Sequence, residues 1–472
     1  MVKRKIKKEH IMKKNYFSKT LSIIFLFSIF VAYSLTDKTI IENAKNNNVT
    51  CIDFQFTDLA GSWRSITLPI GQLGNALKNG LSFDGSSIPG CTNINESDLF
   101  LKPDLSTFAL IHNNGQTHAR IICEIYRTTD VPFEADPRSI LKKALREAND
   151  LGYTFLAGPE LEFFLFIPQE NNDLIPLDQR KYFQAEYNLQ IDSYKKELLS
   201  YLHEQGINIE KIHHEVAPGQ YEVSIHYADA LHIADQIMLC KHAIKSFAQK
   251  HSLAATFMPK PLQGCNGSGM HIHFSLFDTN SNKNAFYKSD DSLYLSPTAY
   301  SFIAGVLYYA SELSALFNAS INSYKRLVPG HEAPIYRCWA TKNRSAMIRI
   351  PQINPDQSNA ARAEIRSPDA LCNPYLALAG LLKAGLEGIK KNIQLAKAAE
   401  VNLYHLTPAE LMQKGIDTLP TSLMQSLILF EKSSFIASFL ATGAITQYSK
   451  IKKDELASFS KAITDWEKEN YL

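Results

Sequence analysis

The sequence predicts an α+β protein built in two parts, a small β-rich module followed by a larger domain of strands and helices. Strand-like runs separated by turns occupy residues 50–130. From about residue 136 onward, longer apolar strands alternate with helical stretches. The chain has 472 residues, enough for two parts that each bury a core. An apolar content of 45% with 21 Gly and 20 Pro excludes a collagen-like, low-complexity or wholly disordered chain.

Charge and cysteine content exclude further classes of protein. The formal net charge is +2, which gives no reason to expect nucleic acid as a partner. The seven cysteines are scattered and form no Cys-x-x-Cys pair. This pattern argues against a disulfide framework and against a zinc–thiolate site, and it suits a reducing compartment. We therefore expect a cytoplasmic protein.

The first 35 residues differ from the rest of the chain. Residues 1–19 carry eight basic side chains against one acid, and an apolar run of 15 residues follows at 21–35. That run is shorter than the roughly 20 residues that a membrane-spanning helix needs. A membrane anchor, a secretory signal and a mis-assigned translation start all remain open. We treat 1–35 as an extension and expect membrane contact only if 21–35 is a real anchor.

The β-rich module is expected over residues 36–135. Residues 36–48 predict a short amphipathic helix that begins at a Thr36 or Asp37 cap. Turns such as HNNGQT separate the strands that follow. These strands are predicted at 49–58, 63–70, 107–112 and 119–126.

The larger domain is expected over residues 136–472. Asp136 and Pro137 begin a predicted helix that Gly152 ends. Strands are predicted at 153–166, 213–225, 269–277, 346–351 and 361–367. Helices are predicted at 193–205, 228–251, 296–317 and 373–393, and residues 400–472 are mainly helical.

Charged and imidazole side chains interrupt these apolar strands, several at every second position. Residues i and i+2 of a strand share one face. A carboxylate buried there is costly unless it is paired or bound to a metal. Carboxylate oxygens with one imidazole suit Mg²⁺ or Mn²⁺ better than Zn²⁺. The residues are Glu160, Glu162, His271, His273, Glu364 and Arg366, with Glu215 and Glu222 on either side of the APGQ turn.

Less specific interpretations of these residues stay open at this point. Glu160 and Glu162 would face solvent if their strand lay at the edge of a sheet. The Glu–Arg pair of AEIRS would be worth little as a surface ion pair. We interpret His213 and His214 as satisfied core or surface histidines rather than as ligands.

A second group of candidate residues is cationic. Guanidinium groups bind carboxylates and phosphates bidentately, and arginines beside a carboxylate-held cation suit phosphoryl transfer from a nucleotide. The sequence has neither Gly-x-x-x-x-Gly-Lys-[Ser/Thr] nor Gly-x-Gly-x-x-Gly, so arginines and metal would have to hold the phosphates. A solvated basic surface is the alternative, which the alternation with apolar residues disfavours. The group comprises Lys325, Arg326, Arg344, Arg349, Arg362 and Arg366.

These residues fall within five motifs that carry a family resemblance. From about Thr36 to Leu472 the chain resembles the class I, bacterial-type glutamine synthetases. The resemblance implies a β-grasp-like N-terminal domain and a catalytic domain of the glutamine synthetase/guanido kinase type, with a curved antiparallel sheet and flanking helices. The motifs are FDGSSIPGCTNINESDL, GPELEFFLF, HHEVAPGQYEV with FMPKPLQGCNGSGMHIH, NSYKRLVPGHEAPIYRCWATKNRS, and ARAEIRSPDALCNPYLALAGLL.

The resemblance also implies an activity, cofactors and an assembly. Members of this family ligate ammonia to L-glutamate at the expense of ATP, through γ-glutamyl phosphate, in nitrogen assimilation. Two divalent cations, Mg²⁺ or Mn²⁺, lie in each active site, and ATP is a co-substrate. The family forms homo-dodecamers of two hexameric rings, with each site between two subunits and the loop at Asp84 donated by the neighbour.

Taken one motif at a time, the resemblance also implies a role for each site residue. Asp84, Glu332 and Arg344 are expected to be catalytic, with Glu332 on a flap that closes over the intermediate. One cation is expected on Glu162, Glu215 and Glu222, and the other on Glu160, His271 and Glu364. Glutamate is expected at Glu162, Asn266, Gly267, His271, Arg326, Glu332 and Arg366. ATP is expected at His273, Ser275, Arg344, Arg349 and Arg362, and ammonium at Asp84, Ser87, Tyr182 and Glu215.

Departures from the family pattern leave alternatives. The flap reads PGHEAP with His331, where Tyr is usual, and RKYF surrounds Tyr182 in place of Gly-Gly-Tyr-Phe. Tyr404 is expected to be unmodified, because the insertion typical of the adenylylated branch is missing. A γ-glutamyl-amine or polyamine ligase is the nearest alternative, which the intact Asp84 motif disfavours. A non-catalytic homologue is disfavoured because all six expected metal ligands are present.

Overall fold

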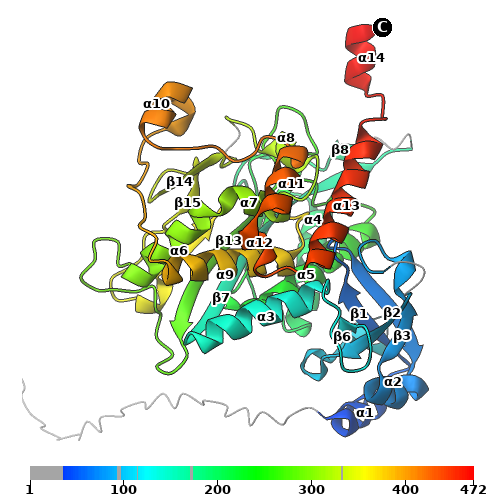
Figure 1. Cartoon of the computed structure of the whole chain (residues 1–472). Helices are drawn as coiled ribbons and strands as arrows, with labels where there is room; N and C mark the ends of the chain where they lie inside the picture. Colours follow the sequence, from blue (N-terminus) through cyan, green and yellow to red (C-terminus); the bar gives the residue numbers. More distant parts are fainter. Residues whose placement is uncertain (1–35, 93–96, 114, 171–173, 331–332) are drawn as a thin grey trace, which may run out of the picture.

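The computed structural model describes residues 36–92, 97–113, 115–170, 174–330 and 333–472. The extension 1–35 and the expected flap residue Glu332 therefore lie outside the described residues. A six-stranded sheet occupies the N-terminal part of the chain, and a ten-stranded sheet occupies the rest (Figure 1). Helices flank both sheets, which confirms the α+β prediction.

The N-terminal sheet has the strand order β2-β1-β6-β4-β3, with β5 paired to β6. Strands β1 and β6 run parallel, and the other pairs are antiparallel. Two strands around the FDGSSI loop, β3 and β4, were not predicted, because each is short and borders a Gly/Ser-rich turn. The strands are β1 (Cys51–Thr57), β2 (Trp63–Pro69), β3 (Leu81–Asp84), β4 (Asp98–Pro103), β5 (Ala109–Asn113) and β6 (Gln116–Tyr126).

Two short helices accompany this sheet, α1 (Asp37–Asn46) and α2 (Leu73–Asn79). Thr36 is the N-cap of α1 and forms a reciprocal capping box with Thr39. The predicted helix and its cap are therefore confirmed.

The large sheet has the strand order β14-β15-β16-β13-β7-β10-β9, and β8, β11 and β12 also pair with β7. All of its pairs are antiparallel except β14 with β15. Its longest strand is β7 (Tyr153–Pro168), which lies between β13 and β10. The others are β8 (Leu174–Pro176), β9 (Ile209–His214), β10 (Gln220–Ile225), β11 (Ala228–Asp229), β12 (Ala254–Thr256), β13 (Met270–Asp278), β14 (Tyr336–Ala340), β15 (Ala346–Arg349) and β16 (Ala363–Ile365).

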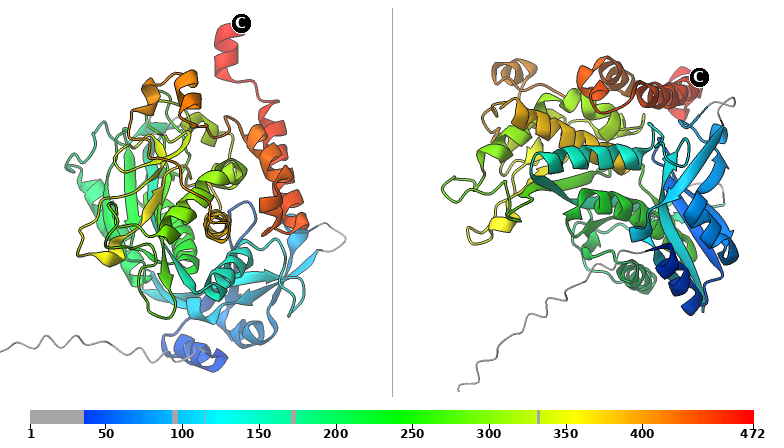
Figure 2. Two further views of the ribbon diagram at one scale, coloured as in Figure 1. Left: turned by 60° about the vertical axis from the view of Figure 1, so that its left-hand side comes forward. Right: turned by 60° about the horizontal axis from the view of Figure 1, so that its bottom comes forward.

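The two faces of β7 have different surroundings. Leu161, Phe163 and Leu165 are fully buried in the main core. Helices α3 (Pro137–Asp150), α5 (Ala230–Lys250) and α6 (Pro297–Tyr308) pack on this face, and α9 (Pro374–Lys390) packs on those helices (Figures 1 and 2). Glu160 and Glu162 alternate with these residues and project to the opposite face. Because β7 lies between β13 and β10, the edge-strand alternative for these two residues is wrong.

The contact between α6 and α9 requires glycine on both helices. A Cβ on Gly388 would lie 2.1 Å from the Ser301 carbonyl oxygen, and one on Gly305 would lie 2.2 Å from the Ala384 carbonyl oxygen. The two backbones therefore approach more closely than any side chain permits.

The predicted helix 296–317 is interrupted. It divides at Tyr309 into α6 and α7 (Ala310–Phe317). The ring of Tyr309 stacks on Phe435, with 4.0 Å between ring centroids, and its hydroxyl accepts a hydrogen bond from Lys391. These tertiary contacts fix the break, and the local sequence pattern does not reveal them.

The remaining helices include α4 (Leu189–Glu204) and α8 (Ser323–Arg326). The C-terminal region is helical as predicted, and α14 projects from the body (Figure 1). Among the described residues, no helix combines the length and the apolar character that crossing a bilayer requires. The C-terminal helices are α10 (Pro408–Gln413), α11 (Leu423–Lys432), α12 (Ser434–Ala437), α13 (Thr442–Phe459) and α14 (Asp465–Tyr471).

One buried arginine, Arg138, links the domain of the N-terminal sheet to the domain of the large sheet. Arg138, in the first turn of α3, is 3% exposed and binds three carboxylates. Its guanidinium lies 2.9 Å from Asp104, 2.8 Å from Glu124 and 2.9 Å from Asp235. Asp104 and Glu124 belong to the N-terminal sheet region, whereas Asp235 lies on α5, so this network spans the junction.

Candidate functional site

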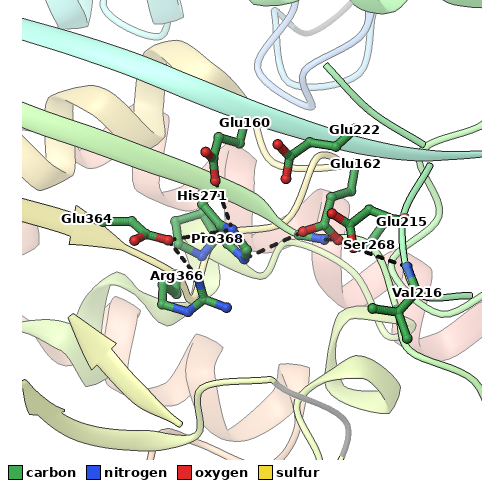
Figure 3. Close-up of polar contacts among 12 residues, drawn as sticks. Glu160, Glu162, Glu215, Val216, Glu222, Ser268, His271, Glu364, Arg366 and Pro368 are labelled. Atoms are coloured by element: carbon green, nitrogen blue, oxygen red, sulfur yellow. Dashed lines mark hydrogen bonds and ion pairs between the residues drawn. The ribbon is translucent and has the colours of Figure 1, made fainter. Parts of the chain in front are cut away.

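The face of the large sheet opposite the helices carries a cluster of carboxylates and imidazoles (Figure 3). The antiparallel registers bring it together, because Glu222 pairs with Glu162, and His271 pairs with Glu160. Glu364 of β16 lies beside β13, where it pairs with His273. Four strands distant in sequence thus present acidic and imidazole groups side by side.

His271 lies at the centre of this cluster. Its Nδ1 is 3.4 Å from Glu160 and 3.7 Å from Glu364, and its Nε2 is 3.7 Å from Glu162. Glu160, His271 and Glu364 can offer ligand atoms that all lie within 4.8 Å of one another. This is one of the two ligand sets expected from the sequence.

The members of the second expected set, Glu162, Glu215 and Glu222, do not form a single group of potential ligands. Glu162, Glu222 and His271 form one group of potential ligands, and His213, Glu215 and Glu222 form another. Glu162 also accepts hydrogen bonds from the Gly269 amide, at 2.9 Å, and from Gln220.

The acidic cluster perturbs the pKa values of its members in opposite directions. Burial, reinforced by Glu215 and Glu222, raises the pKa of Glu162 to about 8. Burial also disfavours ionisation of Glu160, but hydrogen bonds from His271 and His273 outweigh it and hold the pKa of Glu160 well below its usual range. Like charges packed this closely are the environment that a bound cation relieves.

Neighbouring arginines help to lower the pKa values of His271 and Glu364. Burial, together with Arg366, lowers the pKa of His271 to about 4. A neutral imidazole is the form that binds metal. Burial opposes ionisation of Glu364, yet Arg366 and the nearby histidines prevail and lower its pKa to about 2.

Buried arginines border the cluster. Arg326 donates to the backbone carbonyls of Ser367 and Arg366, at 2.9 and 3.0 Å. Arg366 donates to Glu364 at 2.7 Å, and its Nε is buried with no partner among the described residues. A Cβ on Gly267 would lie 2.2 Å from the Pro259 carbonyl oxygen, so only glycine fits beside Arg326.

A cavity of about 150 Å³ joins these groups. Tyr182, Asn266 and Arg344 complete its wall, and Arg349 reaches it while donating to Glu364 at 2.5 Å. The cavity is lined almost entirely by charged and polar side chains. It can therefore hold a small charged ligand beside the acidic cluster.

A second cavity, of about 690 Å³, adjoins the first. Glu160, Lys211 and Arg349 line both cavities. His273 and Arg362 lie in its wall, and Arg362 donates to His273 Nδ1 at 3.2 Å. The acidic cluster thus lies between a small polar chamber and a larger one, an arrangement that suits a reaction between two substrates that enter separately.

Comparison with known families identifies this architecture. The family model described as "Glutamine synthetase, beta-Grasp domain" matches residues 48–128, and "Glutamine synthetase, catalytic domain" matches residues 134–471. The chain belongs to the glutamine synthetase family.

Individual relatives agree with this assignment. A glutamine synthetase of Clostridium saccharobutylicum is 43% identical over 441 residues, which cover 93% of this chain and 98% of the relative. One from Thermotoga maritima is 41% identical over 442 residues, covering 93% and 100%.

Solved structures of the glutamine synthetase fold also resemble the structure of this chain. A cryo-EM structure of Plasmodium falciparum glutamine synthetase has a TM-score of 0.83 at 28% identity, covering 93% of this chain and 99% of that one. A structure titled as a GmaS/ADP complex also has a TM-score of 0.83, at 30% identity, covering 92% and 99%.

Within this glutamine synthetase fold, the expected residues divide between the two cavities. Ser275 lies in the wall of the larger cavity with His273, Arg349 and Arg362, whereas Arg344 lines the smaller one. The residues expected at glutamate that lie within the described chain all line the smaller cavity, as does Tyr182: Glu162, Asn266, Gly267, His271, Arg326 and Arg366.

The expected ammonium group is not brought together within one chain. Asp84 and Ser87 are exposed and line neither cavity. Ser86 and Ser87 donate hydrogen bonds to Asp84 that lower the pKa of its carboxyl group. The other two expected members, Tyr182 and Glu215, lie in the smaller cavity.

The residues of the glutamine synthetase site that were not predicted from the sequence include Gln220, which donates to Glu162, as well as Lys211 and His213. Lys211 lies 3.2 Å from Glu222 and 3.6 Å from Glu160. His213, interpreted as a satisfied histidine, instead lies in the smaller cavity 3.3 Å from Glu215, with its Nδ1 lacking a partner among the described residues. Lys211, His213 and Glu215 alternate along β9 and its extension, a period-two signal that would have identified Lys211 and His213.

By contrast, the interpretation of His214 holds. It is buried, and its two ring nitrogens contact Asp178 and the Glu215 carbonyl oxygen, at 2.8 and 2.6 Å.

Proposed function

We propose that the chain is a class I glutamine synthetase that ligates ammonia to L-glutamate with ATP, giving L-glutamine, ADP and phosphate through γ-glutamyl phosphate. The observation that carries this proposal is the acidic cluster between two adjoining cavities, with buried arginines lining the smaller cavity and half-buried arginines lining the larger one. Two anionic substrates can reach opposite sides of the cluster without crossing each other. Family membership supports the same conclusion.

The residues present fit a pair of divalent cations. Oxygen donors dominate the cluster, and the one imidazole in the expected sets, His271, belongs to the set with Glu160 and Glu364 and is held neutral by burial and Arg366. One cation would bind Glu160, His271 and Glu364, and the other Glu162, Glu215 and Glu222. Mg²⁺ and Mn²⁺ are the ions that this donor set favours. When bound, such cations neutralise phosphate charge and polarise the transferring phosphoryl group.

Glutamate would occupy the smaller cavity. Arg326 and Arg366 supply guanidinium groups to its carboxylates, and Asn266 and Gly267 offer polar backbone and amide groups. The Nε of Arg366 is a donor without an acceptor among the residues that the structure describes, and a substrate carboxylate would satisfy it.

ATP would occupy the larger cavity. His273, Arg349 and Arg362 can bind its phosphates, and Ser275 lies in the same wall. Arg344 lines the smaller cavity, where it can stabilise charge on the phosphoryl group during transfer. Phosphate would then be transferred past the acidic cluster to the glutamate side chain.

Ammonia would attack the acyl phosphate from a site that Tyr182 and Glu215 border. Asp84 and Ser87 would complete that site from a neighbouring subunit, and Asp84 would accept the proton released. Glu332, on the flap, would shield the intermediate from water. The exposed position of Asp84 supports such an intersubunit site, and we propose a cytoplasmic homo-dodecamer of two hexameric rings.

A direct assay tests the activity. Purified protein is incubated with ATP, Mg²⁺ and glutamate, and phosphate release is compared with ammonium, methylamine and putrescine as the acceptor. The proposal expects the highest kcat/KM with ammonium and glutamine as the product. A preference for either amine would reassign the chain as a γ-glutamyl-amine ligase. Absence of turnover with all three would indicate a non-catalytic homologue.

A further inference from the structure

A third cavity lies at the junction of the two domains, away from the acidic cluster. Its volume is about 320 Å³, within the range of small-molecule sites. Its wall includes β5, β6 and the short turn before β5 on one side, and the N-terminal half of α5 on the other. It shares no lining residue with the two cavities of the proposed active site.

Two buried arginines line this cavity, and they differ in how many hydrogen bonds and ion pairs their guanidinium groups form. Arg138 binds three carboxylates, as described above. Arg120, on β6, is only 4% exposed, and its single hydrogen bond runs from Nε to Gln205 at 3.3 Å. Among the described residues, neither terminal nitrogen of Arg120 has a hydrogen-bond or ion-pair partner.

The surroundings of Arg120 leave it without a carboxylate of its own. Asp104 and Asp235 also line the cavity, but both are bound to Arg138. Asp229 is exposed and accepts the Leu231 amide as the N-cap of α5. Burial lowers the pKa of Arg120, which reflects the cost of holding a cation there.

The remaining wall restricts what the ligand can be. Ile122, Ile207 and Leu239 contribute apolar surface to the cavity, beside the polar side chains of Ser106, Thr107, His232 and Gln236. A guanidinium with two free terminal nitrogens matches the two oxygens of a carboxylate. An apolar wall beside it favours a carboxylate with a short hydrocarbon body over a hydrated inorganic anion.

We propose that this junction cavity is a binding site for a small organic carboxylate, which Arg120 holds through its terminal nitrogens. The site goes beyond the proposed function and does not depend on it. A bound ligand would contact β6 of the N-terminal domain and α5 of the catalytic domain together, so its occupancy would stabilise the junction.

Ligand-observed saturation-transfer NMR on the full-length assembled protein tests the site. Isobutyrate is the probe, isobutyramide is its uncharged analogue, and inorganic phosphate is the competing anion. Saturating glutamate, Mg²⁺ and a non-hydrolysable ATP analogue fill the proposed active site. We expect saturable isobutyrate binding with a Kd of about 1–10 mM, and no saturable binding of isobutyramide.

Variants assign the binding to this cavity. Arg120→Gln removes the cation and should weaken isobutyrate binding at least about tenfold, and Arg120→Lys should weaken it less. Ala109 lies directly opposite Arg120 in the β5–β6 register, so Ala109→Leu should obstruct the cavity without changing its charge. Arg146→Gln, at an exposed position of α3, is the matched control and should bind as the unsubstituted protein does.

Three outcomes would overturn the proposal. The first is no saturable binding of isobutyrate to the unsubstituted protein. The second is unchanged binding in both Arg120→Gln and Ala109→Leu, which would make Arg120 a structural group balanced at a distance by Asp235. The third is displacement of isobutyrate by phosphate at a concentration below the Kd of isobutyrate, which would contradict the assigned ligand class. Thermal melting of each variant verifies that it is folded.

Discussion

At the scale of single residues, Glu364 occupies the most constrained position in the acidic cluster. It is fully buried, and it contacts His271, Arg349 and Arg366 together. A carboxylate that serves both as an expected metal ligand and as the partner of two arginines has two functions that neutral side chains cannot replace.

We expect Glu364→Ala to reduce Mg²⁺-dependent phosphate release by at least about 100-fold, because it removes a ligand and leaves two arginines without their acid. Steady-state phosphate release over a range of Mg²⁺ concentrations measures the loss. Glu387→Ala, on α9 and lining neither cavity of the proposed active site, should retain activity. Full activity in Glu364→Ala would refute the ligand role.

The sequence identified most of these residues because period-two alternation on a strand is visible without a structure. It could not show that Glu162 and Glu160 would acquire pKa values shifted in opposite directions, because that depends on cross-strand neighbours. The sequence also carries a period-two signal for His213, through its alternation with Lys211 and Glu215, that the prediction did not use.

At the scale of secondary-structure elements, the N-cap of α3 is an unusual one. Asp136 accepts the Ser139 amide at 2.9 Å, yet it is buried, and burial raises the pKa of its carboxyl group to about 7. The folded state therefore retains a proton that the unfolded chain releases near pH 4. The stabilisation is complete below about pH 4 and is lost as the pH rises through 7.

Asp136→Asn should abolish this pH dependence while keeping the cap, because asparagine is an equally good N-cap residue. Between about pH 5 and pH 8, the melting temperature of the unsubstituted protein should fall by more than that of the variant. Asp229→Asn, at the exposed cap of α5, is the matched control. Parallel melting curves for Asp136→Asn and the unsubstituted protein would contradict the assignment.

The glycine contact between α6 and α9 gives a second prediction at this scale. Gly388→Ala should lower the free energy of unfolding by about 1–3 kcal/mol, because its methyl group would meet backbone rather than a movable side chain. Chemical denaturation measures the change. Gly71→Ala, whose Cβ would have no neighbour within 4 Å, should change stability far less.

Element prediction from the sequence succeeded where capping and periodicity were strong, as for α1 and α3. It failed for β3 and β4, which lie on either side of the Gly/Ser-rich loop, because β3 has only four residues and the apolar run of β4 is limited to Leu99–Leu101. It also failed at Tyr309, where stacking on Phe435 decides the end of α6. In each case the deciding interaction comes from residues distant in sequence.

At the scale of the whole molecule, the position of Asp84 implies that one chain cannot complete the proposed ammonium site. Coexpression of Asp84→Ala and Glu364→Ala subunits tests this. If each site takes Asp84 from one subunit and Glu364 from the next, random assembly of equal amounts should restore about a quarter of the sites. Each variant alone should be inactive, and an inactive mixture would place the whole site within one subunit.

The Arg138 network has a consequence for how the protein unfolds. Separating the N-terminal sheet from α5 would leave one guanidinium and up to three carboxylates without their ion-pair partners in a partly buried junction. This is unfavourable for both domains. The two domains should therefore melt together, and calorimetry should record one endotherm rather than two. The Arg138 network thereby adds a charged link to a hydrophobic core that is already continuous across the two domains.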